Sequence, residues 1–239
     1  MRGLAPQPLT SQFGRPEDGK TAPTKRRRFL FRVKLRTVIR TALKPSDESL
    51  DALLVRLGGC RVCARHLPLG PRPVLQVAPD ARILILSQAP GTRVHETGLN
   101  FNDRSGDRLR DWMGVDRDTF YDNHRIAVMG MAFCYPGRDG KGGDLPPRPE
   151  CAPLWHPGLL AHLPRVALTL LVGSYAIDYY MPDAKRQSMT ETVKAWRSAP
   201  VETLPLPHPS WRTTAWEKKN PWFRRTLVPE LRRRVAALL

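Results

Sequence analysis

Four short apolar runs, separated by stretches with helical patterning, constrain the fold of this chain more than any other feature of its sequence. The runs are Ala81–Leu86, Ile126–Phe133, Ala167–Gly173 and Val201–Leu206. The first is apolar and β-prone, which is typical of a buried strand that leads into a loop. Strands that alternate with helices favour an α/β fold, so we predict a central, mainly parallel four-stranded sheet sandwiched by helices.

Helical patterns fill the intervals between these runs. Leucines at helical spacing from Leu50 to Leu57 follow a Ser-Asp-Glu-Ser segment that begins at Ser46 and supplies an N-cap. Gly58 and Gly59 should end that helix. Further helices are predicted at Ser105–Trp112, from Ser174 to Tyr180 and at Arg224–Leu239. The Pro- and Gly-rich stretch Tyr135–Pro149 predicts a long loop, and loops of that length are usually functional or mobile.

The charge of the chain is strongly positive and unevenly distributed. The formal net charge is +17, and residues 1–45 hold 12 basic and 2 acidic residues, or +10, which leaves +7 for residues 46–239. We predict a basic tail over residues 1–45, disordered in its first 24 residues and able to form a helix over 25–44, followed by one domain over 46–239. The excess charge favours a polyanionic partner, and we rank nucleic acid above a membrane surface or simple solubility.

Nothing in the sequence indicates a membrane or secretory protein. No stretch approaches the roughly 18–20 apolar residues that span a bilayer. The first 24 residues also lack the apolar region of a secretory signal. We expect a cytoplasmic monomer that associates with the nucleoid.

The four cysteines of the chain fit one four-thiolate site. Cys60 and Cys63 form a Cys-x-x-Cys pair, and Cys134 and Cys151 flank the predicted loop. Such a set accepts either zinc or a four-iron four-sulfur cluster, and the spacing does not separate the two. Two disulfides, or buried free thiols, are the plainer alternatives.

Several motifs occur in an order that resembles a known family. They are Cys60-x-x-Cys63, the loop Ser87-Gln88-Ala89-Pro90-Gly91, Gly98-Leu-Asn-Phe101 with Ser105-Gly106-Asp107-Arg108-Leu109, Cys134 with Cys151, and His208-Pro209-Ser210. In this order they resemble the iron–sulfur (family 4-like) bacterial branch of the uracil-DNA glycosylase superfamily. The resemblance covers roughly residues 48–239. It implies DNA as the partner and favours a four-iron four-sulfur cluster over zinc.

The resemblance also implies roles for individual residues. Phe101 matches the family's base-stacking phenylalanine, and His208 matches the histidine that stabilises negative charge on uracil O2. The loop that contains Ala89, Pro90 and Gly91 matches the loop that approaches the scissile bond, and Ser210 belongs to the second substrate loop. On bare sequence, Phe101 could equally be a core residue and His208 could merely end a strand.

Three positions depart from the family pattern. Gln88 replaces the usual glutamate, and an amide cannot act as a general base. Asp103, two residues after Phe101, is our candidate substitute, although it could also be a solvated loop acid. Gly130 stands where the family carries an asparagine that reads uracil, so strict uracil selection is doubtful.

The segment after His208 predicts contacts with DNA. The family inserts a wedge into the base stack at this place, and Trp211 and Arg212 occupy it here. Lys218 and Lys219 add positive charge nearby, between Trp216 and Trp222. These last two tryptophans could instead be core anchors beneath a basic surface.

Two functions from different classes follow from these motifs. The first is a monofunctional DNA glycosylase that flips and hydrolyses uracil or a related deaminated base, which Phe101 and His208 favour. The second is a catalytically weak or inactive DNA-binding protein of the same fold, which Gln88 and Gly130 favour. A zinc-stabilised nucleic-acid module unrelated to glycosylases would require the motif order to be accidental.

Overall fold

The computed structural model describes residues 48–140 and 142–239. The predicted disorder of the first 24 residues, the helix over 25–44 and the boundary of the tail at residue 45 lie outside the described residues. The fold below is therefore that of the predicted domain.

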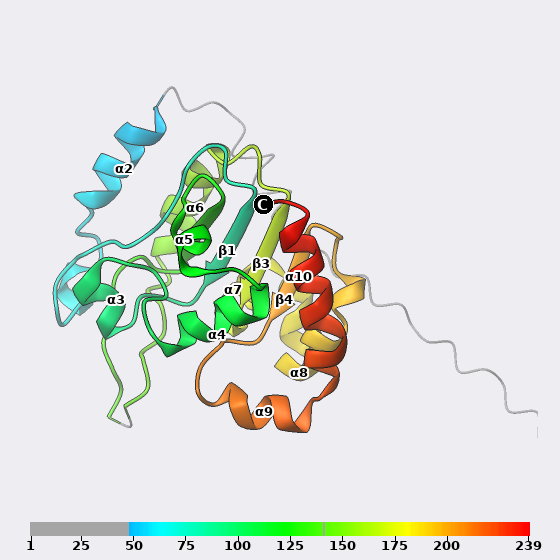
Figure 1. The fold of residues 1–239 in the computed structure, drawn as a ribbon. Coiled ribbons are helices and arrows are strands. Elements are labelled where there is room, and N and C mark those ends of the chain that lie inside the picture. Colours follow the sequence, from blue (N-terminus) through cyan, green and yellow to red (C-terminus); the bar gives the residue numbers. More distant parts are fainter. Residues whose placement is uncertain (1–47, 141) are drawn as a thin grey trace, which may run out of the picture.

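The sheet has the four strands that the apolar runs predict (Figure 1). They are β1 (Ile83–Ser87), β2 (Ile126–Gly130), β3 (Leu168–Val172) and β4 (Thr203–Leu206), and every residue in them is buried. All pairings are parallel and the strand order is β2-β1-β3-β4. The prediction of a parallel four-stranded α/β sheet is confirmed.

The parallel register brings the carboxyl ends of the strands to one edge of the sheet. Ser87 at the end of β1 lies opposite Gly130 at the end of β2, and Val172 at the end of β3 lies opposite Leu206 at the end of β4. The four loops that follow the strands therefore share one edge, where ligands bind in open α/β sheets.

Helices cover both faces of the sheet, as Figure 1 shows. The α-helices are α2 (Leu50–Gly58), α3 (Thr92–Thr97), α4 (Arg104–Met113), α5 (Arg117–Tyr121), α6 (Cys151–Ala161), α7 (Ser174–Tyr180), α8 (Met189–Lys194), α9 (Thr213–Lys219) and α10 (Val228–Ala236). Short 3₁₀ helices span Ala64–His66, Pro182–Arg186 and Trp196–Ser198, and a π-helical turn spans Phe223–Leu227. None of the helices in the described ranges is both long and apolar enough to cross a bilayer.

The core consists of two apolar layers, one on each side of the sheet. Because successive strand side chains point to opposite faces, Leu84 and Leu86 of β1 join the layer under α2, α6 and α7. Ile83 and Ile85 join the layer under α4, α5 and α10. The continuous apolar strands of the sequence are explained by this double coverage.

Helix α2 begins and ends where the sequence predicts. The Ser49 hydroxyl accepts a hydrogen bond from Ala52 N at 3.2 Å, and the helix ends at Gly58 with Gly59 as its C-cap. The predicted C-terminal helix is shorter than expected, because α10 begins only at Val228 after the π-helical turn. Pro229 has no N–H to donate, so the regular helical hydrogen-bond ladder is interrupted there.

The second strand is also shorter than predicted. It ends at Gly130 and not at Phe133, because the chain turns back there: Met131 N donates to Ser87 O at 2.8 Å and Ala132 N donates to Gln88 O at 3.2 Å. An apolar run cannot distinguish a strand from a buried turn, and this turn is built by the neighbouring strand's carbonyl groups.

Candidate active site

The loop after β1 forms one wall of the strand-end edge. Gln88 and Ala89 are half-buried, Pro90 is buried, and Gly91 is the N-cap residue of α3. Gln88 Nε2 lies 3.5 Å from Leu145 O in the loop between β2 and α6, at the outer limit of a hydrogen bond. The β1 loop is therefore packed against a segment that is more than fifty residues away in sequence.

His208 lies at the same edge, two residues after β4. It packs against Gly173 at the end of β3, where a methyl group would lie 3.3 Å from His208 Cβ. Gly173 also has φ +89°, which disfavours any other residue. Burial lowers the pKa of His208, and the negative charge of Asp103 opposes this. Within the described residues the imidazole makes no hydrogen bond, so a neutral donor faces the strand-end edge.

Asp103 has a structural role that the sequence did not reveal. It is the N-cap of α4, and its Oδ1 accepts a hydrogen bond from Gly106 N at 2.9 Å. Its charge also acts on His208, so the two predicted catalytic side chains lie near each other. The structure thus brings Asp103 to the site, with one carboxylate oxygen already engaged.

Phe101 is held in an unusual backbone conformation. Its φ of +53° is in the left-handed region, which no other non-glycine residue within the described ranges adopts. The turn lies against α4, since a methyl group on Gly106 would be 1.7 Å from Phe101 O. Its side chain is 9% exposed and meets Phe120 edge to face, with ring centroids 6.1 Å apart. The Phe101 side chain is therefore partly a core residue, as the alternative reading expected. Its left-handed backbone costs about 1–2 kcal/mol.

The loop after His208 presents a large aromatic side chain to solvent. Trp211 is 78% exposed, and the Arg212 guanidinium lies 5.4 Å from the centroid of its ring. Arg108 of α4 fixes this loop: its Nη1 donates to Ser210 O at 2.7 Å and its Nη2 donates to Thr214 Oγ1 at 2.6 Å. Sequence reasoning quoted Arg108 within a motif but gave it no role.

The tryptophans on either side of the lysine pair belong to the core. Trp216 Nε1 donates to Thr190 Oγ1 at 2.8 Å, and its ring meets Phe223 with centroids 5.3 Å apart. Trp222 packs against the same cluster. A role for these two rings in stacking on bases is therefore not supported, whereas Lys218 and Lys219 at the end of α9 are exposed.

Gly130 occupies a position that has no room for a side chain. A methyl group there would lie 2.4 Å from Ala132 O and 3.4 Å from Ala89 Cα. The carbonyl of Gly130 accepts a hydrogen bond from His156 Nε2 at 2.9 Å, and His156 Nδ1 accepts one from Tyr180 at 2.6 Å. His156 is completely buried, which lowers its pKa to about 4. No sequence signal pointed to this pair, since neither residue lies in a motif.

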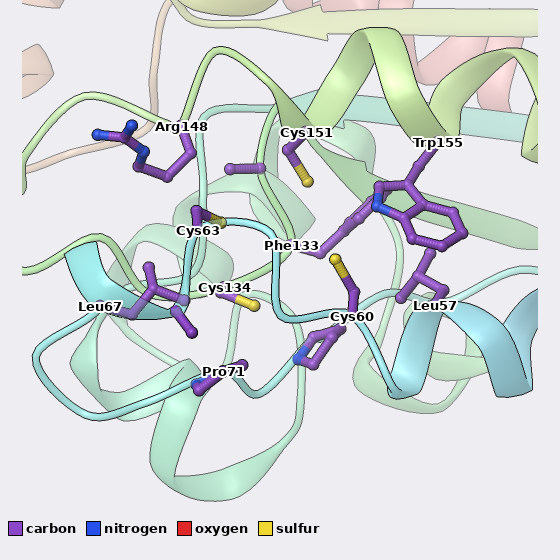
Figure 2. Close-up of a pocket in the computed structure, with 13 residues that line it drawn as sticks. Leu57, Cys60, Cys63, Leu67, Pro71, Phe133, Cys134, Arg148, Cys151 and Trp155 are labelled. Atoms are coloured by element: carbon purple, nitrogen blue, oxygen red, sulfur yellow. The ribbon is translucent and has the colours of Figure 1, made fainter.

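The four cysteines line one pocket beside this edge. Cys60 and Cys63 follow α2, Cys134 follows the turn after β2, and Cys151 opens α6. All four are free thiols, and Figure 2 shows their sulfur atoms turned toward a common space. The other walls are mostly apolar, with Leu57, Leu67, Pro71, Phe133 and Trp155, and Arg148 lies at one side. The four cysteines thus line one pocket, and their predicted role as ligands of one metal site stays a prediction.

The environment of Cys63, Cys134 and Cys151 raises the pKa of each thiol, chiefly through burial. Burial raises the pKa of Cys134 to about 11 and that of Cys151 to about 12, and the nearby cysteines add to both shifts. Buried thiols with raised pKa values are poor nucleophiles. Among the described residues, no three Cys, His, Asp or Glu side chains lie near enough to one another to hold a single metal ion.

One comparison with known proteins identifies the domain. A family model described as the uracil DNA glycosylase superfamily matches residues 75–232. The match begins before β1 and ends within α10, so it contains all four strands and the strand-end loops with Gln88, Phe101 and His208. Cys60 and Cys63 lie before it.

Proposed function

Because this chain belongs to the uracil-DNA glycosylase superfamily, we propose that it is a monofunctional DNA glycosylase that hydrolyses uracil or a related deaminated base and leaves an abasic site. The observation that carries the proposal is the position of His208, a half-buried imidazole with a lowered pKa, which lies at the strand-end edge against Gly173 and near Asp103. No lysine stands at a motif position where it could form a Schiff base, so a lyase step is not included.

The proposed reaction requires stabilisation of the departing base. When the bond between the sugar C1′ and the base nitrogen breaks, negative charge gathers on the base and positive charge on the sugar. The nucleotide must first leave the stack to reach a pocket. His208 would donate a hydrogen bond to the base oxygen, and the Phe101 ring would contact the face of the base.

The polar groups near the scissile bond are Gln88 and Asp103. An amide does not accept a proton, so Gln88 can orient water or the sugar but cannot act as a base. Asp103 supplies negative charge close to His208 and is the base candidate that the sequence nominates, although its Oδ1 also caps α4. A negative charge here would also stabilise the developing cationic sugar.

The proposed selectivity is broader than for uracil alone. The backbone at Gly130 leaves no space for the asparagine that the resembling family uses to read uracil. Recognition of the base edge would then depend on backbone groups, which also suit other deaminated bases such as hypoxanthine and xanthine.

DNA is the proposed partner of the exposed loop and of α9. Trp211 is large enough to fill the space that a flipped base vacates. Arg212, Lys218 and Lys219 are exposed beside it and would contact phosphates, which position the protein without reading sequence. The basic residues of the tail over 1–45 would add affinity of the same nonspecific kind.

We also propose that the four cysteines hold a four-iron four-sulfur cluster. The proposal is supported by four free thiols that line one mostly apolar pocket and lie close enough for their charges to act on one another. When bound, the cluster would supply iron–thiolate bonds that cross-link α2, the turn after β2 and the start of α6. Its role would be structural, because the pocket lies apart from His208 and Phe101.

The excision of deaminated bases is the experiment that tests this function. Purified protein would be incubated with oligonucleotides that carry uracil, hypoxanthine or xanthine, and alkali would cleave any abasic site. The proposal expects cleavage for at least one of these bases. Binding without cleavage of every substrate would favour the alternative function, a DNA-binding member of the same fold, to which Gln88 and Gly130 point.

A further inference from the structure

A carboxylate that no motif contains lies at the strand-end edge. Asp144 belongs to the loop between β2 and α6, where Arg138 and Asp144 form an antiparallel bridge. The pairing is extended by Leu145 N, which donates to Gly137 O at 2.9 Å, and by Gly143 N, which donates to Asp139 Oδ1 at 2.8 Å. In Figure 1 this segment is the light green hairpin that extends beyond α3.

The hairpin packs against the β1 loop. A methyl group on Gly91 would lie 3.7 Å from Asp144 Oδ2. Gln88 Nε2 lies 3.5 Å from the carbonyl oxygen of Leu145, the residue after Asp144. Gly91 belongs to the loop that matches the family's scissile-bond loop. The Asp144 carboxylate therefore lies beside the backbone of that loop.

Charged groups from two elements face Asp144. On its own hairpin, Arg138 Nε lies 3.8 Å from Asp144 Oδ1, and Asp139 contributes a second negative charge. From the N-cap of α4, Asp103 adds a third carboxylate. Burial is the largest influence and raises the pKa of Asp144, with Asp103 and Asp139 adding to the rise and Arg138 opposing it. The side chain is still 45% exposed, so water can reach it.

We propose that Asp144 is a catalytic base in excision and accepts a proton from the water that attacks C1′. This inference rests on the proposed glycosylase function. In the step, the bond between C1′ and the base nitrogen breaks and its electron pair leaves with the base, near His208. The water oxygen forms the new bond to C1′, and one water proton passes to the Asp144 carboxylate, which later returns it to solvent or to the base.

Asp144 supplies the chemistry that Gln88 lacks. Gln88 stands where the resembling family carries a glutamate. Asp144 lies beside Gly91, which is three residues after Gln88 in the same loop. Asp103 is less suited to the role because its Oδ1 accepts the capping hydrogen bond of α4. A carboxylate with a raised pKa and solvent access is better matched to a proton transfer near neutral pH.

The first test compares isosteric variants in single-turnover excision. Asp144→Asn should lower the plateau rate by about 10²–10⁴-fold, the usual contribution of a general base. Asp139→Asn removes a charge from the same hairpin and keeps Oδ1 as an acceptor for Gly143 N, so its plateau rate should stay within about threefold of the parent. Unfolding temperature and affinity for undamaged DNA should be unchanged in both.

The second test uses the pH profile, which a purely structural residue would not shift. The base must be ionised, so the rate should fall as pH drops through the pKa of Asp144. Arg138→Ala removes the opposing positive charge and should move this acid limb to higher pH, whereas Asp139→Asn should move it to lower pH. This readout holds even if Asp144→Asn proves unstable.

The outcomes separate the two proposals. A parent that excises a base while Asp144→Asn retains its rate would overturn the role of Asp144 and leave the glycosylase function standing. Loss of activity in Asp103→Asn with full activity in Asp144→Asn would give the role to Asp103 instead. A parent that excises none of the three bases would overturn both the function and the catalytic role of Asp144.

Discussion

At the scale of single residues, the site depends on glycines as much as on polar side chains. Gly173 packs against His208, Gly106 packs against the Phe101 carbonyl, and Gly91 lies beside the Asp144 carboxylate. At Gly106 and Gly173 a Cβ would come too close to its neighbour, whereas at Gly91 it would make an ordinary contact. In the sequence Gly91 and Gly106 were read only as parts of motifs and Gly173 only as the end of a strand, because their contacts depend on the folded chain.

The dependence of the site on glycines leads to a prediction for Gly130. Gly130→Asn restores the residue that the resembling family carries, but its Cβ would lie 2.4 Å from Ala132 O, a backbone atom that cannot move aside cheaply. We expect a loss of about 1–3 kcal/mol of stability, or a lower unfolding temperature by about 2–4 °C per kcal/mol. Thermal unfolding and uracil excision would both be measured. A variant that is as stable as the parent and more selective for uracil would contradict the account.

At the scale of elements, the buried pair on α6 and α7 holds the turn after β2. His156 donates to Gly130 O and accepts from Tyr180, so a helix side chain binds the last carbonyl group of the strand. Neither α6 nor this turn was predicted. Pro157 argues against a helix in sequence, and the burial of a histidine is decided by tertiary packing.

This pair predicts a pH dependence of stability. The folded pKa of His156 is about 4, below the value of 6.5 of a free histidine, so the unfolded chain binds the proton more readily. The stabilisation is complete above pH 6.5 and is lost as pH falls toward 4, by up to about 3 kcal/mol. Denaturant unfolding would compare the parent, His156→Gln and the exposed control His124→Gln. Only His156→Gln should lessen the loss between pH 6.5 and 5, and equal slopes for all three would contradict the assignment.

The thiol pocket gives a second prediction at this scale. Protein purified without oxygen should be brown and contain about four irons per chain, since four cysteines that line one pocket suit a four-iron cluster. Cys60→Ser should lose iron and solubility, while the choice of excised base stays the same because His208 and Phe101 lie elsewhere. Iron and zinc analysis of both proteins would decide. Stoichiometric zinc without iron would refute the cluster.

At the scale of the whole molecule, alternation of apolar strands and helices predicted the architecture well. Each strand is buried on both faces, so its apolar character survives in the sequence without reference to its neighbours. Gln88 and His208 follow β1 and β4 and so lie at one edge of the sheet, because parallel strands place their carboxyl ends together. Asp103 lies near His208 for a different reason, as the N-cap of α4. Asp144 and Arg108 were missed because their roles depend on contacts between distant segments.

The loop that bears Trp211 is connected to α4, a helix from a distant part of the chain. Arg108 of α4 connects the loop that bears Trp211 to the helix whose N-cap is Asp103, through two hydrogen bonds to Ser210 O and Thr214 Oγ1. Trp211 itself is among the most exposed large side chains of the described domain. This connection explains how insertion into DNA could place a flipped base beside His208.

The most direct measurement of the central claim is single-turnover excision by the parent and by His208→Ala on one set of duplex and single-stranded oligonucleotides with uracil, hypoxanthine or xanthine. The account predicts that the parent leaves alkali-labile sites at one or more of these bases. It predicts that His208→Ala is slower by about 10²–10³-fold, the usual cost of one hydrogen-bond donor to a developing negative charge, with unchanged affinity for undamaged DNA. Excision at equal rates by both proteins, or by neither, would contradict it.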